Sequence, residues 1–294
     1  METNTIVKGG KVARTSFVMQ LLMGIAEVFM GTFTLSVGLI ADGIQAFADA
    51  GVSLIIWIGL RVSRRGPDGK FHFGYYRVET FSSIIAAFFM ATLGGIVLYA
   101  SYREFLQPTP IMNAELAMTV ALLATAVSLI LLIYKIRAAR RYASLALKTD
   151  ATNSIKDVLT SITAFLGIAL SNYFNIVQAD AIAGIIISFF VFTMAYAIIK
   201  EASLVLMDAC QCPEILTDIE NLAISVKQVK GVHSLRMRKL GSYLIGDIHV
   251  VVDADLTVRE SAGIAYEIEE RLKKEFDTVI EIKVRIDPDE PIAN

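Results

Sequence analysis

Long apolar runs alternate with short polar segments over the first two thirds of the chain. A helix that crosses a bilayer needs ~20 mostly apolar residues, and six runs reach that length. The runs cover residues 13–36, 40–62, 79–105, 114–137, 149–172 and 178–206. We therefore expect six transmembrane helices, followed after Met207 by charged segments of the kind found in soluble domains.

The segment after the sixth run mixes helical and strand periodicity. Its apolar positions recur at helical spacing in two stretches and alternate in three, with Gly241 at the centre of a predicted β-hairpin. The expected elements are a helix over 213–230, strands over 232–240 and 243–253, a helix over 258–276 and a strand over 279–286. This order predicts a small αββαβ domain of ferredoxin-like type, an α+β fold.

The basic residues predict the orientation, because lysine and arginine gather in cytoplasmic loops. They cluster before the first run, between the second and third, and between the fourth and fifth: Lys8, Lys11, Arg14; Arg61, Arg64, Arg65, Lys70, Arg77; Lys135, Arg137, Arg140, Arg141, Lys148. The opposite connections carry only Arg103. We expect both termini in the cytoplasm, with a transmembrane domain over 1–206 and a cytoplasmic domain over 207–294. No cleavable signal peptide is expected, since the first run is too long.

Composition agrees with an integral protein of the plasma (inner) membrane. The 294 residues are 55% hydrophobic, and the formal net charge is −2. These values exclude a disordered chain and give no basic surface for nucleic acid, so the bilayer is the expected environment.

Two of the apolar runs carry the same three polar residues at spacings of three and four. They are Asp42, Gln45 and Asp49 in the second run and Asp150, Asn153 and Asp157 in the fifth. These spacings place each set on one face of its helix. An aspartate near mid-membrane costs ~2.5 to 3.5 kcal/mol on insertion scales, so four cost roughly 10 kcal/mol. Facing stripes of this kind predict an oxygen-lined cation site.

Two histidines of the tail are placed symmetrically about the predicted hairpin turn. His233 and His249 lie eight residues on either side of Gly241, so they face each other across the strands. Asp287, at the end of the last strand, could add a carboxylate. The sequence leaves two readings open: a metal site, or two exposed histidines and an acidic turn residue.

With these features in place, the chain resembles the cation diffusion facilitator family of divalent-metal transporters. The resemblance covers nearly the whole chain and rests on the order of several pieces. They are Leu35-Ser36-Val37-Gly38-Leu39-Ile40-Ala41-Asp42, Asp49, Phe73-Gly74 with Arg77 and Glu79, the stripe of the fifth run, Leu206-Met207-Asp208 and Ile286-Asp287-Pro288. It implies a homodimer that exchanges a metal ion for protons and is not an enzyme, with no cofactor other than the transported ion.

The resemblance places the transport site on Gln45, Asp49, Asn153 and Asp157. The commoner zinc-type pattern has histidine or aspartate in place of Gln45 and histidine in place of Asn153, so here all four ligands become oxygen donors. Such sets suit manganese and other hard ions better than zinc. We therefore expect export of manganese or ferrous iron, with a zinc or cadmium exporter of the same family as the alternative.

The resemblance also bears on residues outside this set. His233, His249 and Asp287 match positions where family members bind regulatory metal. The loop that contains Asp68 and His72 departs from the family pattern, and we expect it to be metal-free or weakly occupied. Asp42 and Asp150 are candidates for supporting the metal ligands from behind, for the ion pathway or for helix capping.

Three further features remain open at this stage. Glu27 could line the pathway, and Lys156 is expected to form a structural pair with Glu27 or another acid. Cys210 and Cys212 are expected to be ordinary linker residues without a disulfide, because they follow the last span on the reducing side.

Two rival classes are a membrane metal sensor or ligand-gated cation channel and an intramembrane metal-dependent hydrolase. A channel would conduct independently of any counter-ion gradient. A hydrolase would need a water-activating base, and the sequence contains no His-Glu-x-x-His segment.

Overall fold

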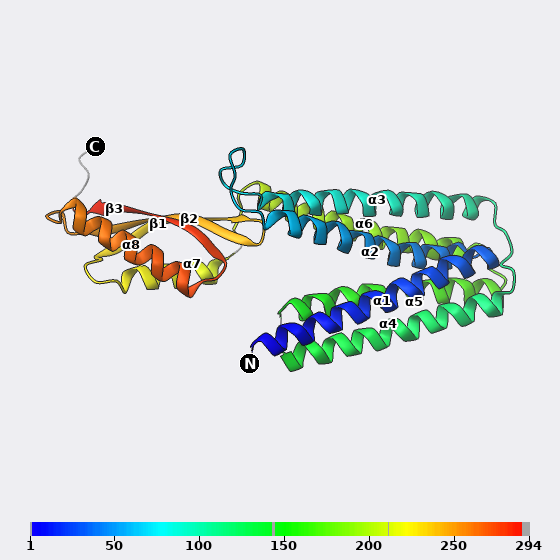
Figure 1. The fold of residues 1–294 in the computed structure, drawn as a ribbon. Coiled ribbons are helices and arrows are strands. Elements are labelled where there is room, and N and C mark those ends of the chain that lie inside the picture. The colour runs from blue at the N-terminus through cyan, green and yellow to red at the C-terminus, as the bar shows by residue number, and fades with distance from the viewer. Residues whose placement is uncertain (1, 143–144, 211, 290–294) are drawn as a thin grey trace. The chain divides into compact units, whose positions relative to one another are not determined.

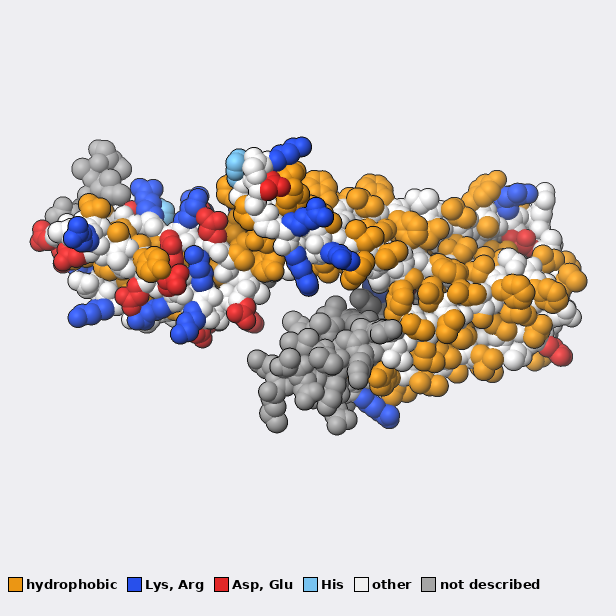
Figure 2. Space-filling view, viewed as in Figure 1, with side chains coloured by type: hydrophobic (Ala, Val, Ile, Leu, Met, Phe, Trp, Pro, Cys, Tyr) orange, Lys and Arg blue, Asp and Glu red, His pale blue; other side chains and the backbone are white. Residues whose placement is uncertain are grey.

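The computed structural model describes residues 2–142, 145–210 and 212–289, with side chains over 15–138, 154–210 and 212–289. Six long helices come first (Figure 1): α1 (Glu2–Thr34), α2 (Val37–Ser63), α3 (Arg77–Leu106), α4 (Ala114–Tyr142), α5 (Leu145–Tyr173) and α6 (Ala179–Leu206). In the described residues, all six are long and apolar enough to cross a membrane. The predicted spans are therefore confirmed. On the face shown in Figure 2, hydrophobic side chains cover much of the surface of these helices.

The chain divides into two compact units. One combines residues 1–55 with 85–198, and the other combines 56–84 with 199–294. The first unit contains most of the helical bundle, and the second contains the tail with the adjoining helix ends.

Helix α1 packs closely against α2 because small residues meet at their crossing. A Cβ atom on Gly24 would lie 2.8 Å from the Cβ of Ala46, and one on Gly43 would lie 2.9 Å from the carbonyl oxygen of Gly24. Glycines at both positions thus let the two backbones approach, as expected for helix packing in membranes. This approach brings the polar residues of α2 up to α1.

The start of α2 is fixed by a buried carboxylate from α6. Asp180 accepts hydrogen bonds from the Ser36 hydroxyl at 2.9 Å and from the Val37 backbone N–H at 2.7 Å. The Ser36 hydroxyl in turn accepts from the Leu39 N–H. These bonds satisfy donors at the helix N-terminus and so hold the helix that carries Gln45 and Asp49.

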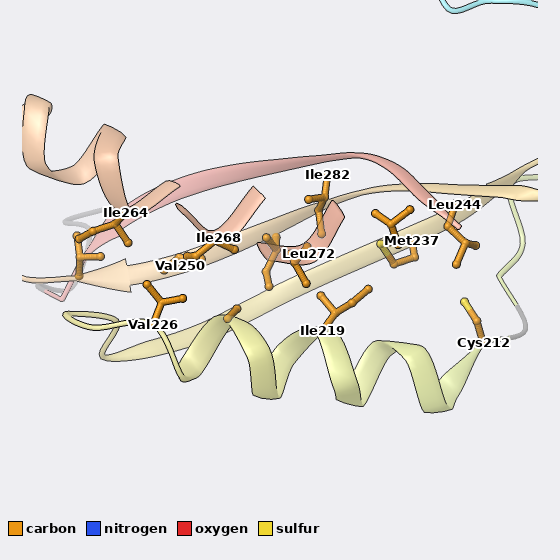
Figure 3. Close-up of a cluster of buried hydrophobic side chains, with 14 residues drawn as sticks. Cys212, Ile219, Val226, Met237, Leu244, Val250, Ile264, Ile268, Leu272 and Ile282 are labelled. Carbon is orange, nitrogen blue, oxygen red and sulfur yellow. The ribbon is translucent and has the colours of Figure 1, made fainter. Parts of the chain in front are cut away.

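The tail folds as predicted, with the order αββαβ. Its elements are α7 (Pro213–Ile224), β1 (Gly231–Leu240), β2 (Tyr243–Val252), α8 (Val258–Glu275) and β3 (Val279–Pro288). The sheet order is β1-β2-β3, with β1 antiparallel and β3 parallel to β2. Helices α7 and α8 cover one face, and Ile219, Val250, Ile268, Leu272 and Ile282 are completely or almost completely buried in the core between the layers (Figure 3).

The cysteines of the linker between α6 and α7 differ from the prediction. The structure joins Cys210 and Cys212 by a disulfide, so the expectation of two unbonded linker residues is wrong. With one residue between them, their Cα atoms lie 5.4 Å apart, within the usual span of a disulfide. Cys212 is also buried in the tail core.

Candidate metal centre

The helices of the first unit enclose a cavity of about 70 Å³ that receives residues from α1, α2, α4 and α5. Gln45 and Asp49 of α2 and Asp157 of α5 all line it. The carboxylates of Asp49 and Asp157 are close enough to act on each other electrostatically. Asp157, about 110 positions away in the sequence, thus lines the same space as Gln45 and Asp49.

The fifth-helix stripe is described only in part. The side chains of Asp150 and Asn153 lie outside the described residues, although the helical backbone of α5 includes both positions. Asn153 precedes Asp157 by four residues, about one helical turn. Its membership of the site remains a prediction.

Gln45 is buried within the helices and has an unsatisfied oxygen. The residue is 2% exposed, and its Oε1 atom has no hydrogen-bond partner. A buried amide oxygen without a donor carries a desolvation cost of about 1 to 3 kcal/mol. A cation in the cavity would relieve that cost.

Gln20 of α1 reaches the cavity, and the sequence analysis missed it. Its Nε2 donates a hydrogen bond of 2.7 Å to Oδ2 of Asp157. An amide within an otherwise apolar part of the first span was the available signal. The bond orients one oxygen of the Asp157 carboxylate, which stabilises its charge.

Asp42 and Glu27 line the same cavity. Asp42 is 5% exposed and Glu27 3% exposed. The two carboxyl groups act on each other electrostatically, and the hydroxyls of Thr160 and Ser161 lie near Asp42. Asp42 thus belongs to the cavity and does not simply end a helix at the membrane surface.

Lys156 does not pair with Glu27 in the structure. Glu27 faces Asp42, and no ion pair of Lys156 occurs among the described side chains. Of the two expected partners, Glu27 or another acid, the structure does not give Glu27, because helix packing turns Glu27 toward α2. Lys156 does act electrostatically on Asp49.

Lys135 was counted among the basic loop residues, but it lies inside α4. It is 3% exposed, and its Nζ donates a hydrogen bond of 2.8 Å to the Ser154 hydroxyl of α5. It also acts electrostatically on Asp49. Its position near the end of a run concealed this role, since spacing does not show which helix faces which.

The tail contains a second cluster of ligand types. His249 Nδ1 lies 2.7 Å and His233 Nε2 3.3 Å from Oδ2 of Asp287, and the ring centroids are 5.0 Å apart. His233 pairs directly with His249 in the β1–β2 register, as the predicted hairpin required. One ligand atom from each of the three residues lies within 4.8 Å of the others, so they could hold one ion.

The charge of Asp287 is stabilised by its neighbours. Burial alone would raise its pKa, but the hydrogen bond and charge of His249, with Arg285 and His233, lower the pKa below its ordinary value. A carboxylate that stays ionised is ready to bind metal.

The acidic residue of the loop between α2 and α3 forms its hydrogen bonds within that loop. Asp68 accepts hydrogen bonds from the backbone N–H groups of Lys70 and Phe71 and from the Tyr75 hydroxyl. These bonds, with the nearby Tyr75, lower the pKa of Asp68. Both oxygens thus accept hydrogen bonds within the loop, and the expectation of a weak or absent metal site there remains a prediction.

Two profiles of known protein families match this chain. The profile of the "Cation efflux transmembrane domain" matches residues 13–207, and that of the "Cation efflux protein, cytoplasmic domain" matches 212–289. The chain belongs to the cation diffusion facilitator family. This cation diffusion facilitator is accordingly an integral membrane protein, and the members of its family are cation-efflux transporters.

Individual relatives match over almost their full length. The chain is 27% identical to the "Manganese efflux system protein MneP" of Bacillus subtilis, covering 95% of each chain. It is 32% identical to the "Manganese efflux system protein MneS" of the same organism, covering 91% of this chain and 92% of the relative. A solved structure of the MamM CTD in a cadmium form covers 27% of this chain and 100% of its own, at 21% identity and a TM-score of 0.27.

Proposed function

We propose that this transporter exports a hard divalent cation, with manganese or ferrous iron favoured, through a site made by Gln45, Asp49, Asn153 and Asp157. The observation that carries the proposal is the shared cavity of Gln45, Asp49 and Asp157. All are oxygen donors when the amide binds through its carbonyl, and oxygen sets suit manganese better than zinc. The unsatisfied Gln45 Oε1 is the kind of atom that such an ion would complete.

The relatives support the choice of ion. MneP and MneS are both named as manganese efflux proteins. Zinc or cadmium export is the alternative, and it would require the cavity to accept a borderline or soft ion without a histidine or cysteine among its described lining residues.

The proposed mechanism is exchange of metal for protons. The termini lie in the cytoplasm of the plasma-membrane protein, and the ion enters the cavity from that side. Carboxylates bind metal only when deprotonated, so protons arriving from outside compete for Asp49 and Asp157 and displace the ion. Coupling then needs no separate proton site.

The tail has a regulatory and dimerising role in this proposal. The matching cytoplasmic-domain profile is that of a dimerisation domain, and twofold pairing is common for such modules. His233, His249 and Asp287 would bind an ion that stabilises the active dimer. Their short mutual distances support this role.

Reconstituted transport tests the proposal. Purified protein in liposomes should take up manganese with saturation and with matching proton counterflow, and Asp49→Ala should abolish both. A flux that ignores the proton gradient would instead favour a channel. Normal transport by Asp49→Ala would remove the proposed site.

A further inference from the structure

Two buried carboxyl groups of the first unit lie beside the proposed transport site without belonging to it. Glu27 of α1 and Asp42 of α2 line the same cavity and act on each other electrostatically. Each belongs to a membrane-spanning helix and is almost completely buried. Two such residues cost roughly 5 to 7 kcal/mol on insertion scales, which a purely structural contact does not explain.

Their surroundings supply no positive side chain. Among the described residues that line the cavity, none is lysine, arginine or histidine. A like pair of carboxylates cannot both ionise in a dry site without a cation between them. A divalent cation between the two groups would supply the missing positive charge.

The remaining atoms around Asp42 are also of the type that binds hard cations. Oδ2 of Asp42 is buried and has no hydrogen-bond partner, and the Thr160 and Ser161 hydroxyls of α5 lie near the same carboxyl group. Carboxylate and hydroxyl oxygens from three helices thus line the same cavity. The unsatisfied oxygen is an observation independent of the acidic pair.

We propose that Glu27 and Asp42, with the hydroxyls of Thr160 and Ser161, form a second station for a hard divalent cation. Asp42 precedes Asp49 by seven residues, about 10 Å along the helix. The direction and the cargo rest on the proposed function: with the N-terminus of α2 outside, this station receives the ion from Asp49 and Asp157 on its way out.

Counting bound ions tests the station directly. The experiment uses the full-length protein in lipid nanodiscs, with His233→Ala and His249→Ala to remove metal binding by the tail cluster. This background protein is titrated with Mn²⁺, and electron paramagnetic resonance measures the bound ions. The background should bind two ions per protomer. Glu27→Gln keeps the side-chain shape but loses the charge, so it should bind one ion per protomer in the same Mn²⁺ range. The affinity for the second ion should fall about 10-fold or more.

Matched variants separate the possible failures. Glu115→Gln, an exposed acid-to-amide change in α4, should leave both ions in place. If Asp157→Ala still binds as many ions as the background, the proposed function fails. If Asp157→Ala loses an ion while Glu27→Gln keeps both, the station alone is overturned, and a changed proton counterflow in Glu27→Gln would then identify a proton site instead.

A transport measurement guards against simple misfolding. Glu27→Gln should lower kcat more than it changes KM, because release is slowed while uptake from the cytoplasm is kept. If Glu27→Gln unfolds, Asp42→Asn takes its place in the same titration. Unchanged stoichiometry in the folded variant contradicts the station.

Discussion

The helical cavity and the tail cluster are the two metal sites of the proposed function, and they offer different chemistry. The described cavity residues provide amide, carboxylate and hydroxyl oxygens, and its carboxylates come from separate helices. The tail provides two imidazoles and one carboxylate from adjacent strands of a single sheet. The cavity thus suits a hard ion that must leave again, whereas the tail suits a more nitrogen-loving ion in a fixed geometry.

The largest effect is expected from a variant that removes the cavity site and leaves the tail cluster intact. Asp157→Ala should abolish manganese transport in liposomes, because it deletes a carboxylate that Gln20 holds in place. Metal binding by the tail should be unchanged, as measured by calorimetry on the same protein. Leu159→Ala, an exposed change on the same helix, is the control. Transport by Asp157→Ala at the normal rate would contradict the assignment.

A second change should make the cavity resemble the tail in ligand type. Asn153→His replaces an amide with an imidazole, so the ratio of zinc uptake to manganese uptake should rise. A rise of about 10-fold is expected, because changes around a metal's ligands commonly alter affinity by that amount. Competition uptake with both ions present measures this ratio. An unchanged ratio would show that Asn153 does not contact the ion.

A smaller effect is expected at Lys135, where the direction of the change in KM tests the cavity. Lys135→Met removes a buried positive charge that acts on Asp49, so the KM for manganese should fall about 3- to 10-fold. Lys135→Arg keeps the charge and should stay near the parent value. Damage to the helix packing would raise KM instead, so the direction of the change distinguishes the two causes.

The smallest effect concerns the tail and depends on pH. Because the pKa of Asp287 is lowered in the fold, its carboxylate stabilises the tail above the ordinary carboxyl range, and this stability is lost as pH falls through the lowered pKa. Asp287→Asn should cost about 1 kcal/mol at neutral pH without metal. The difference should vanish in acid; thermal unfolding across pH measures it. If the stability difference between the parent and Asp287→Asn stays constant with pH, the charge of Asp287 is not its cause.

Much of the architecture was readable from periodicity. The six apolar runs and the alternating tail segments predicted every long helix and the αββαβ order, and symmetry about Gly241 predicted the facing histidines. Within one helix or hairpin, spacing decides which residues share a face. That is why the cavity residues of α2 and the tail cluster were found.

Contacts between separate helices were not readable in this way. Gln20, Glu27 and Lys135 act through neighbours on other helices, and their positions depend on which faces meet. The close crossing at Gly24 and Gly43 determines that Glu27 meets Asp42. Such tertiary packing has no short-range signal, so spacing alone did not show that Glu27 meets Asp42 and not Lys156.

The most direct test of the account is the position of the transported ion. An anomalous difference map at the manganese absorption edge, from the full-length protein with Mn²⁺, should show a peak that Gln45, Asp49 and Asp157 contact together. A map in which Asp49 and Asp157 contact different ions, or none, would contradict the shared site.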